Sequence, residues 1–147
     1  MDTAMAKDLQ NLIRINEWEV DEKRRKLGEL LRLMANLEAQ AQALEEELVR
    51  EQREAGDKPV EAGLLYGAYA ESVIERRERI RESIEKMEQA IAEAREELRV
   101  AYLELKKFEV AQENRDKKLA KEAARRETIE YDEVAIQGFR KAQAAKR

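Results

Sequence analysis

Glu-Ala-Gly-Asp-Lys-Pro-Val-Glu-Ala-Gly, residues 54–63, is the one stretch of this chain in which glycine and proline cluster. Proline lacks a backbone donor, and glycine adopts the conformations that reverse a chain, so we expect a helix to end here. The segments on both sides repeat apolar residues with a period of seven. The stretch therefore decides between one continuous helix and two helices joined by a turn, and it favours the turn.

The segment before this turn is a regular heptad series. With Ala6 at position a, eleven of the thirteen a and d positions are apolar, and the series runs without a stutter for more than six heptads. Such regularity is strong evidence for a coiled coil. The a positions are Ala6, Ile13, Val20, Leu27, Met34, Ala41 and Leu48, and the d positions are Leu9, Asn16, Lys23, Leu30, Leu37 and Leu44.

A second heptad series follows the turn, and twelve of its thirteen a and d positions are apolar. Its d positions are Tyr66, Val73, Ile80, Met87, Ala94, Ala101 and Phe108, and its a positions are Ala70, Arg77, Ile84, Ile91, Leu98 and Leu105. Lys23 and Arg77 are charged residues within the two series. Polar residues at such positions usually fix the register or carry their charge outward to solvent.

Two apolar series of equal length joined by a turn predict an all-α fold, an antiparallel two-helix coiled-coil hairpin. We expect one domain over residues 1–147, with a first helix at about 4–53, a turn at about 54–63 and a second helix at about 64–140. If Leu48 faces Tyr66, the numbers of paired residues add to about 114, and Ala6 then faces Phe108.

The second helix is predicted to extend beyond its partner as a long C-terminal overhang over residues 109–147. Only three of the eight continued a and d positions are apolar there, and residues 110–147 carry a net charge of +3, against −7 for residues 1–109. A solitary helix of this kind is marginal in water unless something binds it. The overhang is therefore a candidate partner-binding arm.

Composition excludes many kinds of chemistry. The chain has no cysteine and no histidine, so thiolate and imidazole ligands for a metal are missing, as are the usual general base and the cysteine nucleophile. Its paired carboxylates lie on exposed helices, where nothing excludes water, and no glycine-rich phosphate loop exists. We expect no enzyme activity, no catalytic residues, no cofactor and no metal. With no signal sequence or apolar span, we expect a soluble cytoplasmic protein.

Several apolar residues lie outside the predicted seam. Ile15, Trp18, Val100, Leu103 and Val110 fall at c and f positions and are expected to form an exposed docking patch, although scattered surface apolar residues are also common. The overhang adds Ile129, Tyr131, Val134, Ile136 and Phe139, as a partner-binding stretch or a segment that folds back. The basic runs 23–26 and 76–81 are interleaved with Glu, which favours solvated faces with ion pairs along each helix.

The chain resembles the flagellar FliJ family, the stalk-like soluble component of the flagellar type III export apparatus. The resemblance spans nearly the whole chain, including its length and its hairpin with a long second helix. It is carried by Leu12-Ile13-Arg14, residues 20–27 (Val-Asp-Glu-Lys-Arg-Arg-Lys-Leu), residues 37–40 (Leu-Glu-Ala-Gln), residues 66–69 (Tyr-Gly-Ala-Tyr), Glu75-Arg76-Arg77, residues 102–109 (Tyr-Leu-Glu-Leu-Lys-Lys-Phe-Glu) and residues 132–136 (Asp-Glu-Val-Ala-Ile).

The resemblance implies a non-enzymatic stalk that inserts into the ring of the flagellar export ATPase and promotes the assembly and activity of that ring. It also implies links to the export gate protein at the membrane and to export chaperones, and hence a peripheral association with the membrane apparatus. By analogy with the stalk of rotary ATPases, the end that carries both termini would enter the ring. That analogy gives the ATPase contact to the N-terminal turns and to overhang residues that include Arg115, Lys117, Lys118, Arg125, Arg126 and Arg140.

Other classes of protein stay open at this point. The equivalent stalk of a virulence type III secretion system would have the same sequence physics. A structural coiled-coil spacer would differ in oligomeric state, for which a monomeric hairpin is favoured here. A nucleic-acid-binding helical arm is less favoured, because phosphate binding needs a basic face and the arginine runs here are interleaved with acids.

Overall fold

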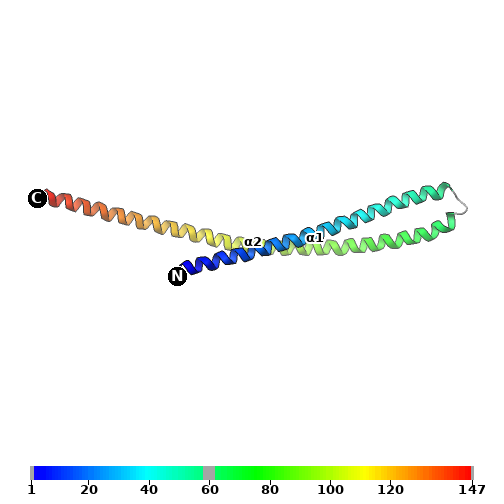
Figure 1. Cartoon of the computed structure of the whole chain (residues 1–147), viewed down its shortest axis with the longest axis horizontal. Helices are drawn as coiled ribbons and strands as arrows, with labels where there is room; N and C mark the ends of the chain where they lie inside the picture. The colour runs from blue at the N-terminus through cyan, green and yellow to red at the C-terminus, as the bar shows by residue number, and fades with distance from the viewer. Residues whose placement is uncertain (1, 58–61, 147) are drawn as a thin grey trace. The chain divides into compact units, whose positions relative to one another are not determined.

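The computed structural model describes residues 2–57 and 62–146 of the chain. It contains two helices, α1 (Asp2–Asp57) and α2 (Ala62–Ala145) (Figure 1). The chain divides into two compact units, residues 16–102 and residues 1–15 with 103–147, and we describe each by itself. The expectation of a single domain over 1–147 stays a prediction. The part of the expected turn at residues 58–61, which includes Pro59, lies outside the described residues.

The unit of residues 16–102 is an antiparallel helical hairpin. Its buried side chains are Val20, Leu44, Val73, Ile91 and Ala94, and each falls at a predicted a or d position. Between Ile13 and Leu48, no a or d residue of α1 is exposed; in α2, Arg77 is the one exposed a or d residue between Tyr66 and Phe108. The heptad prediction of the seam is therefore confirmed, and so is the all-α hairpin.

The predicted register of this hairpin is wrong by one heptad. Glu45 pairs with Arg77 and Glu47 pairs with Arg76, so the numbers of the paired residues add to 122 and 123 rather than to about 114. The ion pair between Lys26 and Glu97, near the other end of the unit, gives 123 as well. Leu48 therefore lies level with Val73, while Tyr66 lies level with Ala55.

The one-heptad shift follows from the length of α1. The expected register leaves residues 49–65 without partners, but α1 continues in helical form through Asp57. Continuing the helix keeps its backbone groups hydrogen-bonded and shortens the connection. It also lets Glu51 and Ala55 become half-buried opposite Ala70 and Tyr66. Gly56, at which we expected the helix to be ending, is accommodated within it.

The two charged seam residues are both paired across the hairpin. Arg77 donates from Nε and Nη2 to the two carboxylate oxygens of Glu45, each at 2.6 Å. Lys23 Nζ lies 3.4 Å from Glu97, which also accepts from Lys26 Nζ at 3.3 Å. Each cation thus extends out of the apolar layer to a carboxylate of the other helix, as expected for polar residues at these positions.

The second unit consists of residues 1–15 of α1 and 103–147 of α2. Ile13 and Leu105 are its buried residues, and Ala6, Leu9 and Phe108 are half-buried. Gln112 and Arg115 are half-buried too. The overhang therefore begins at Asp116 and not at residue 109, because α2 stays partly covered for about two helical turns longer than expected.

Candidate partner-binding surfaces

The C-terminal part of α2 is a helix whose side chains are all exposed. Every residue from Asp116 to Lys146 is exposed, and all but Lys146 belong to α2. The segment is about 45 Å long at the rise of an α-helix. We call it the tail. A helix that buries none of its side chains gains nothing from tertiary packing, so the tail has its whole surface available to a partner.

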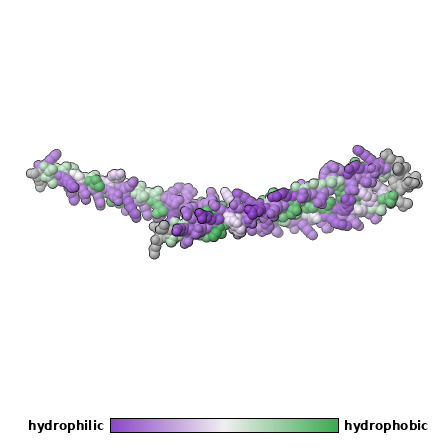
Figure 2. Space-filling view, viewed as in Figure 1, coloured by the Kyte–Doolittle hydropathy of each residue, from purple (hydrophilic) through white to green (hydrophobic). Residues whose placement is uncertain are grey.

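The tail carries large apolar side chains in spite of this exposure. Its six large apolar residues are between 42% and 72% exposed, and they are Leu119, Ile129, Tyr131, Val134, Ile136 and Phe139. Figure 2 shows hydrophobic patches that interrupt its hydrophilic surface. Ile129 and Ile136 are seven residues apart, at the d positions of the continued heptad series, so they share one face of the helix. The expected apolar tail residues are thus all on the surface.

The cations predicted to contact a partner have three different settings. Arg115 is half-buried, at the last covered turn of α2. Lys117 lies 3.1 Å from the Glu113 carboxylate on its own helix. Lys118, Arg125, Arg126 and Arg140 are exposed and, within the described residues, form no ion pair. These four charges, like those of Lys121, Lys141 and Lys146 on the same tail, are available to a carboxylate of another molecule.

The off-seam apolar residues are exposed, as the sequence indicates. Trp18 and Val100 belong to the unit of residues 16–102, with exposed fractions of 61% and 53%. Ile15, Leu103 and Val110 belong to the other unit and are also exposed. That all five form one docking patch stays a prediction. Exposure of a tryptophan on a helical hairpin is uncommon and is typical of binding surfaces.

The prediction of ion pairs along each helix is confirmed for half of the cations in the basic runs. Arg24 and Arg25 pair with Asp21 and Glu22, while Arg79 and Arg81 pair with carboxylates three or four residues away. Hydrogen bonds from Arg81 and Arg99 lower the pKa of Glu78 and Glu96, respectively. Exposed pairs of this kind contribute little to stability. The other four cations of the runs pair across the hairpin instead, and they are Lys23, Lys26, Arg76 and Arg77.

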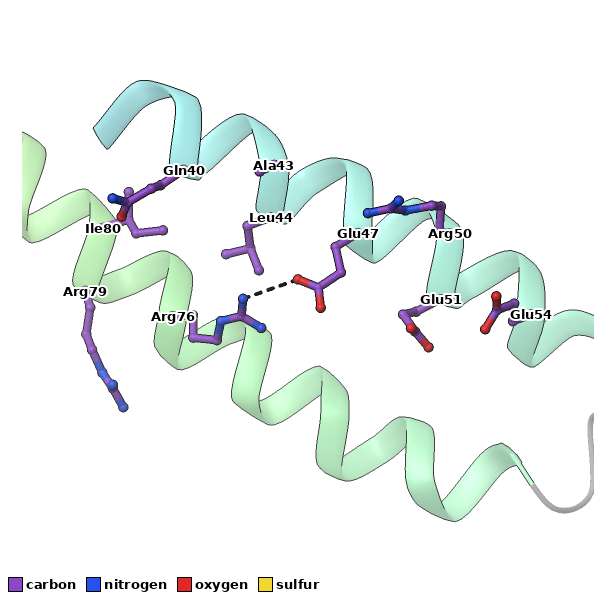
Figure 3. A pocket seen from close by; sticks show the side chains of 10 residues that line it. All are labelled: Gln40, Ala43, Leu44, Glu47, Arg50, Glu51, Glu54, Arg76, Arg79 and Ile80. Carbon is purple, nitrogen blue, oxygen red and sulfur yellow. Dashed lines mark hydrogen bonds and ion pairs between the residues drawn. The ribbon is translucent and has the colours of Figure 1, made fainter. Parts of the chain in front are cut away.

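Two grooves flank the seam of the hairpin, and sequence reasoning missed both. One, of about 780 Å³, has Leu44 and Ile80 at its floor and the ion pair of Glu47 with Arg76 (3.2 Å) across it (Figure 3). The other, of about 620 Å³, lies beside Ala41 and Ile84. Apart from alanines, both grooves are lined by apolar seam residues and by long polar or charged side chains beside them.

Tyr69 is the one titratable side chain here with a buried, unpartnered atom. Its Oη is buried and, within the described part of the chain, has no hydrogen-bond partner. Burial raises the pKa of its hydroxyl, and the charges of Glu47 and Glu51 raise it further.

Two other kinds of site are absent from the part of the chain that the structure describes. No group of three or more acidic side chains is placed to hold a metal ion. No helix combines the length and the apolar character that crossing a membrane requires.

An antiparallel helical hairpin with an exposed helical tail belongs to the class of coiled-coil proteins that act through their surfaces. The family model described as "Flagellar FliJ protein" matches residues 5–144, which is nearly the whole chain. The chain belongs to the flagellar FliJ family, so it is a component of the flagellar protein export apparatus, a type III secretion system. No curated protein and no solved structure matches it.

Proposed function

We propose that this protein is a stalk that binds the ring of the flagellar export ATPase through its tail and promotes the assembly and activity of that ring. The observation that carries the proposal is the exposure of every residue from Asp116 to Lys146, including six large apolar side chains and seven cations that form no ion pair within the described residues. A partner that covered this face would remove apolar side chains of the tail from water, which favours binding. The protein acts by binding and not by catalysis.

The same proposal covers the other partners of the export apparatus. The hairpin, which lies outside the tail, binds the export gate protein at the membrane and export chaperones. Its place is then the cytoplasm, in peripheral association with the membrane export apparatus. These assignments rest on the family, whose members work within that apparatus.

The test is the rate of ATP hydrolysis by the cognate export ATPase, measured at concentrations where its ring is only partly assembled. We expect the full chain to stimulate hydrolysis and a chain ending at Arg115 to lose the stimulation. Circular dichroism should show that the shortened chain keeps the helicity of its hairpin. Undiminished stimulation by the shortened chain would refute the role of the tail.

A point substitution makes the same test more specific. Ile136→Glu places a charge on the continued seam face of the tail, whereas Gln137→Glu adds the same charge to the next exposed residue. Because only the first removes an apolar contact, we expect it alone to reduce ATPase binding, by roughly tenfold or more. Equal effects of the two substitutions would show that binding depends on charge and not on the apolar face.

Trp18 gives a further test of the docking residues. Since its side chain is 61% exposed, Trp18→Ala should reduce partner affinity with little loss of helicity. A large fall in the melting temperature would show instead that the indole stabilises the hairpin.

A further inference from the structure

One face of the hairpin is mostly apolar and carries no charge over two heptads. It consists of d positions and the g positions beside them, all within residues 16–102. We call it the neutral strip. Its members are Leu30, Leu33, Leu37, Gln40 and Leu44 in α1, and Ile80, Ser83, Met87, Ala90 and Ala94 in α2. Eight of these ten residues are apolar, on a chain of which 42% is charged.

Much of the neutral strip is in contact with solvent. Leu33 is 49% exposed, and Leu37 and Met87 are half-buried although they belong to the seam. The small side chains of Ser83 and Ala90 leave the apolar layer beneath them uncovered. The groove of about 780 Å³ forms one end of the strip, with Leu44 and Ile80 in its lining (Figure 3). An uncharged and partly exposed apolar face is unusual on a chain so rich in charge, so the strip is a candidate interaction site.

An ion pair closes each end of the neutral strip, and the two pairs have opposite polarity. At one end the cation is in α1 and the anion in α2, with Lys26 Nζ at 3.3 Å from Glu97. At the other end the anion is in α1 and the cation in α2, with Arg76 at 3.2 Å from Glu47. A half-turn that exchanges the two ends therefore places each charge opposite one of the other sign.

We propose that the neutral strip is the interface of an antiparallel homodimer, in which two hairpins pack face to face as a four-helix bundle. In this dimer α1 packs on α1 of the second copy, and α2 packs on α2. Lys26 then faces Glu47 of the second copy, and Glu97 faces its Arg76. Each end forms a ring of four alternating charges. A two-fold axis makes the same surface patch serve both subunits.

Charges at the rim of the strip favour this orientation. Arg79 and Glu93, in α2, exchange places under the same half-turn, so each meets an opposite charge of the second copy. A parallel dimer would instead set Glu29 against Glu93, two like charges. Lys86 lies near the two-fold axis at the rim, where its flexible stem can carry the ammonium group outward to water.

The size of the interface predicts a weak dimer. The strip from Lys26 to Glu47 is about 32 Å long at 1.5 Å per residue, and two packed helices are about 18 Å wide. Each copy would bury about 600 Å², or about 1,200 Å² in total, which is at the lower limit for specific interfaces. We therefore expect a reversible dimer with a micromolar dissociation constant. It leaves the tail out of the interface and does not depend on the proposed ATPase contact.

The experiment is sedimentation equilibrium of the full chain from about 1 to 300 µM. We expect the mass to rise from 17.1 kDa toward twice that value. The double swap Glu47→Lys with Arg76→Glu keeps the ion pair within the chain but gives both ends the same polarity. Like charges then meet across the interface, so this variant should dimerise at least roughly tenfold more weakly.

A second swap variant tests the pairing directly. Lys26→Glu with Glu97→Lys reverses the other end, and it should also dimerise weakly by itself. A mixture of the two variants should form heterodimers at wild-type concentrations, because every charge again meets its opposite. Circular dichroism controls for folding, which matters for the second variant because Lys23 also contacts Glu97.

One pair of point variants gives a readout that does not depend on the ion pairs. Leu33→Glu puts a charge in the strip, and Leu31→Glu puts the same charge on the opposite side of the seam at a similarly exposed leucine. We expect only the first to weaken dimerisation. A wild-type chain that stays monomeric throughout, a swap variant that dimerises normally, or equal effects at the two leucines would each overturn the proposal.

Discussion

Leu44 offers the sharpest test of what stabilises the hairpin. Its side chain is 3% exposed at a d position, yet both grooves reach it from either side of the seam. Leu-to-Ala changes at buried sites cost about 2–5 kcal/mol, and the cost is lowest where water or side chains can fill the space. Because the grooves admit water, we expect Leu44→Ala to cost about 2–3 kcal/mol.

The matched control is Leu31→Ala, the same change on the same helix at a leucine that is 42% exposed. It should cost about 0.5–1 kcal/mol, in proportion to the smaller area removed from water. In urea denaturation followed by circular dichroism, the midpoint should fall by about 1–2 M for Leu44→Ala and by less than about 0.5 M for Leu31→Ala. Equal shifts for the two variants would refute the single seam as the source of stability.

Three further predictions concern charge, a buried hydroxyl and the tail. Hydrogen bonds from Lys26 and Lys23 lower the pKa of Glu97 in the folded state. The stabilising effect of this carboxylate is therefore present above its ordinary pKa of 4.5 and is lost as the pH falls through the lowered pKa. Between pH 7 and pH 3, the melting temperature should fall less for Glu97→Gln than for the wild type. Tyr69→Phe removes a buried oxygen that has no hydrogen-bond partner, so the urea midpoint of this variant should equal or exceed that of the wild type. A lower midpoint would reveal a hydrogen bond between Tyr69 and Glu47. A Cβ added at Gly138 meets no atom within 4 Å, so Gly138→Ala should raise helicity, and no change in the signal at 222 nm would contradict a formed helix at this position.

The seam could be predicted from the sequence, but its register could not. Heptads repeat, so shifting one helix by seven residues returns apolar positions to apolar positions. Charges do not separate the two registers either. The observed register pairs Lys26 with Glu97, and the expected register would have placed Arg24 near Glu88. Each register therefore offers an ion pair between the helices. What decides is the length of α1, because only the shifted register gives Ala55 and Glu51 partners.

Some of the candidate sites could likewise be predicted from the sequence, and others depend on the register. Residues that are exposed because no second helix reaches them, such as Phe139 and Tyr131, follow from the loss of apolar a and d positions after Arg115. The grooves and the neutral strip depend instead on which g positions face each other. Leu33 and Ala90 become neighbours across the seam only in the observed register, so a prediction in the wrong register could not find them.

The paired turns of α2 explain why the helix continues into the tail. An isolated helix of this length must first form a nucleus, at a cost that exceeds the gain from its first hydrogen bond. In α2 the paired turns up to Arg115 already provide that nucleus, so each further residue adds a hydrogen bond without this cost. Its alanines and long charged side chains then favour continuation, since they lose little conformational freedom in a helix. A partner that binds the tail consequently meets a helix that is already formed, and it needs to supply less free energy for ordering the chain.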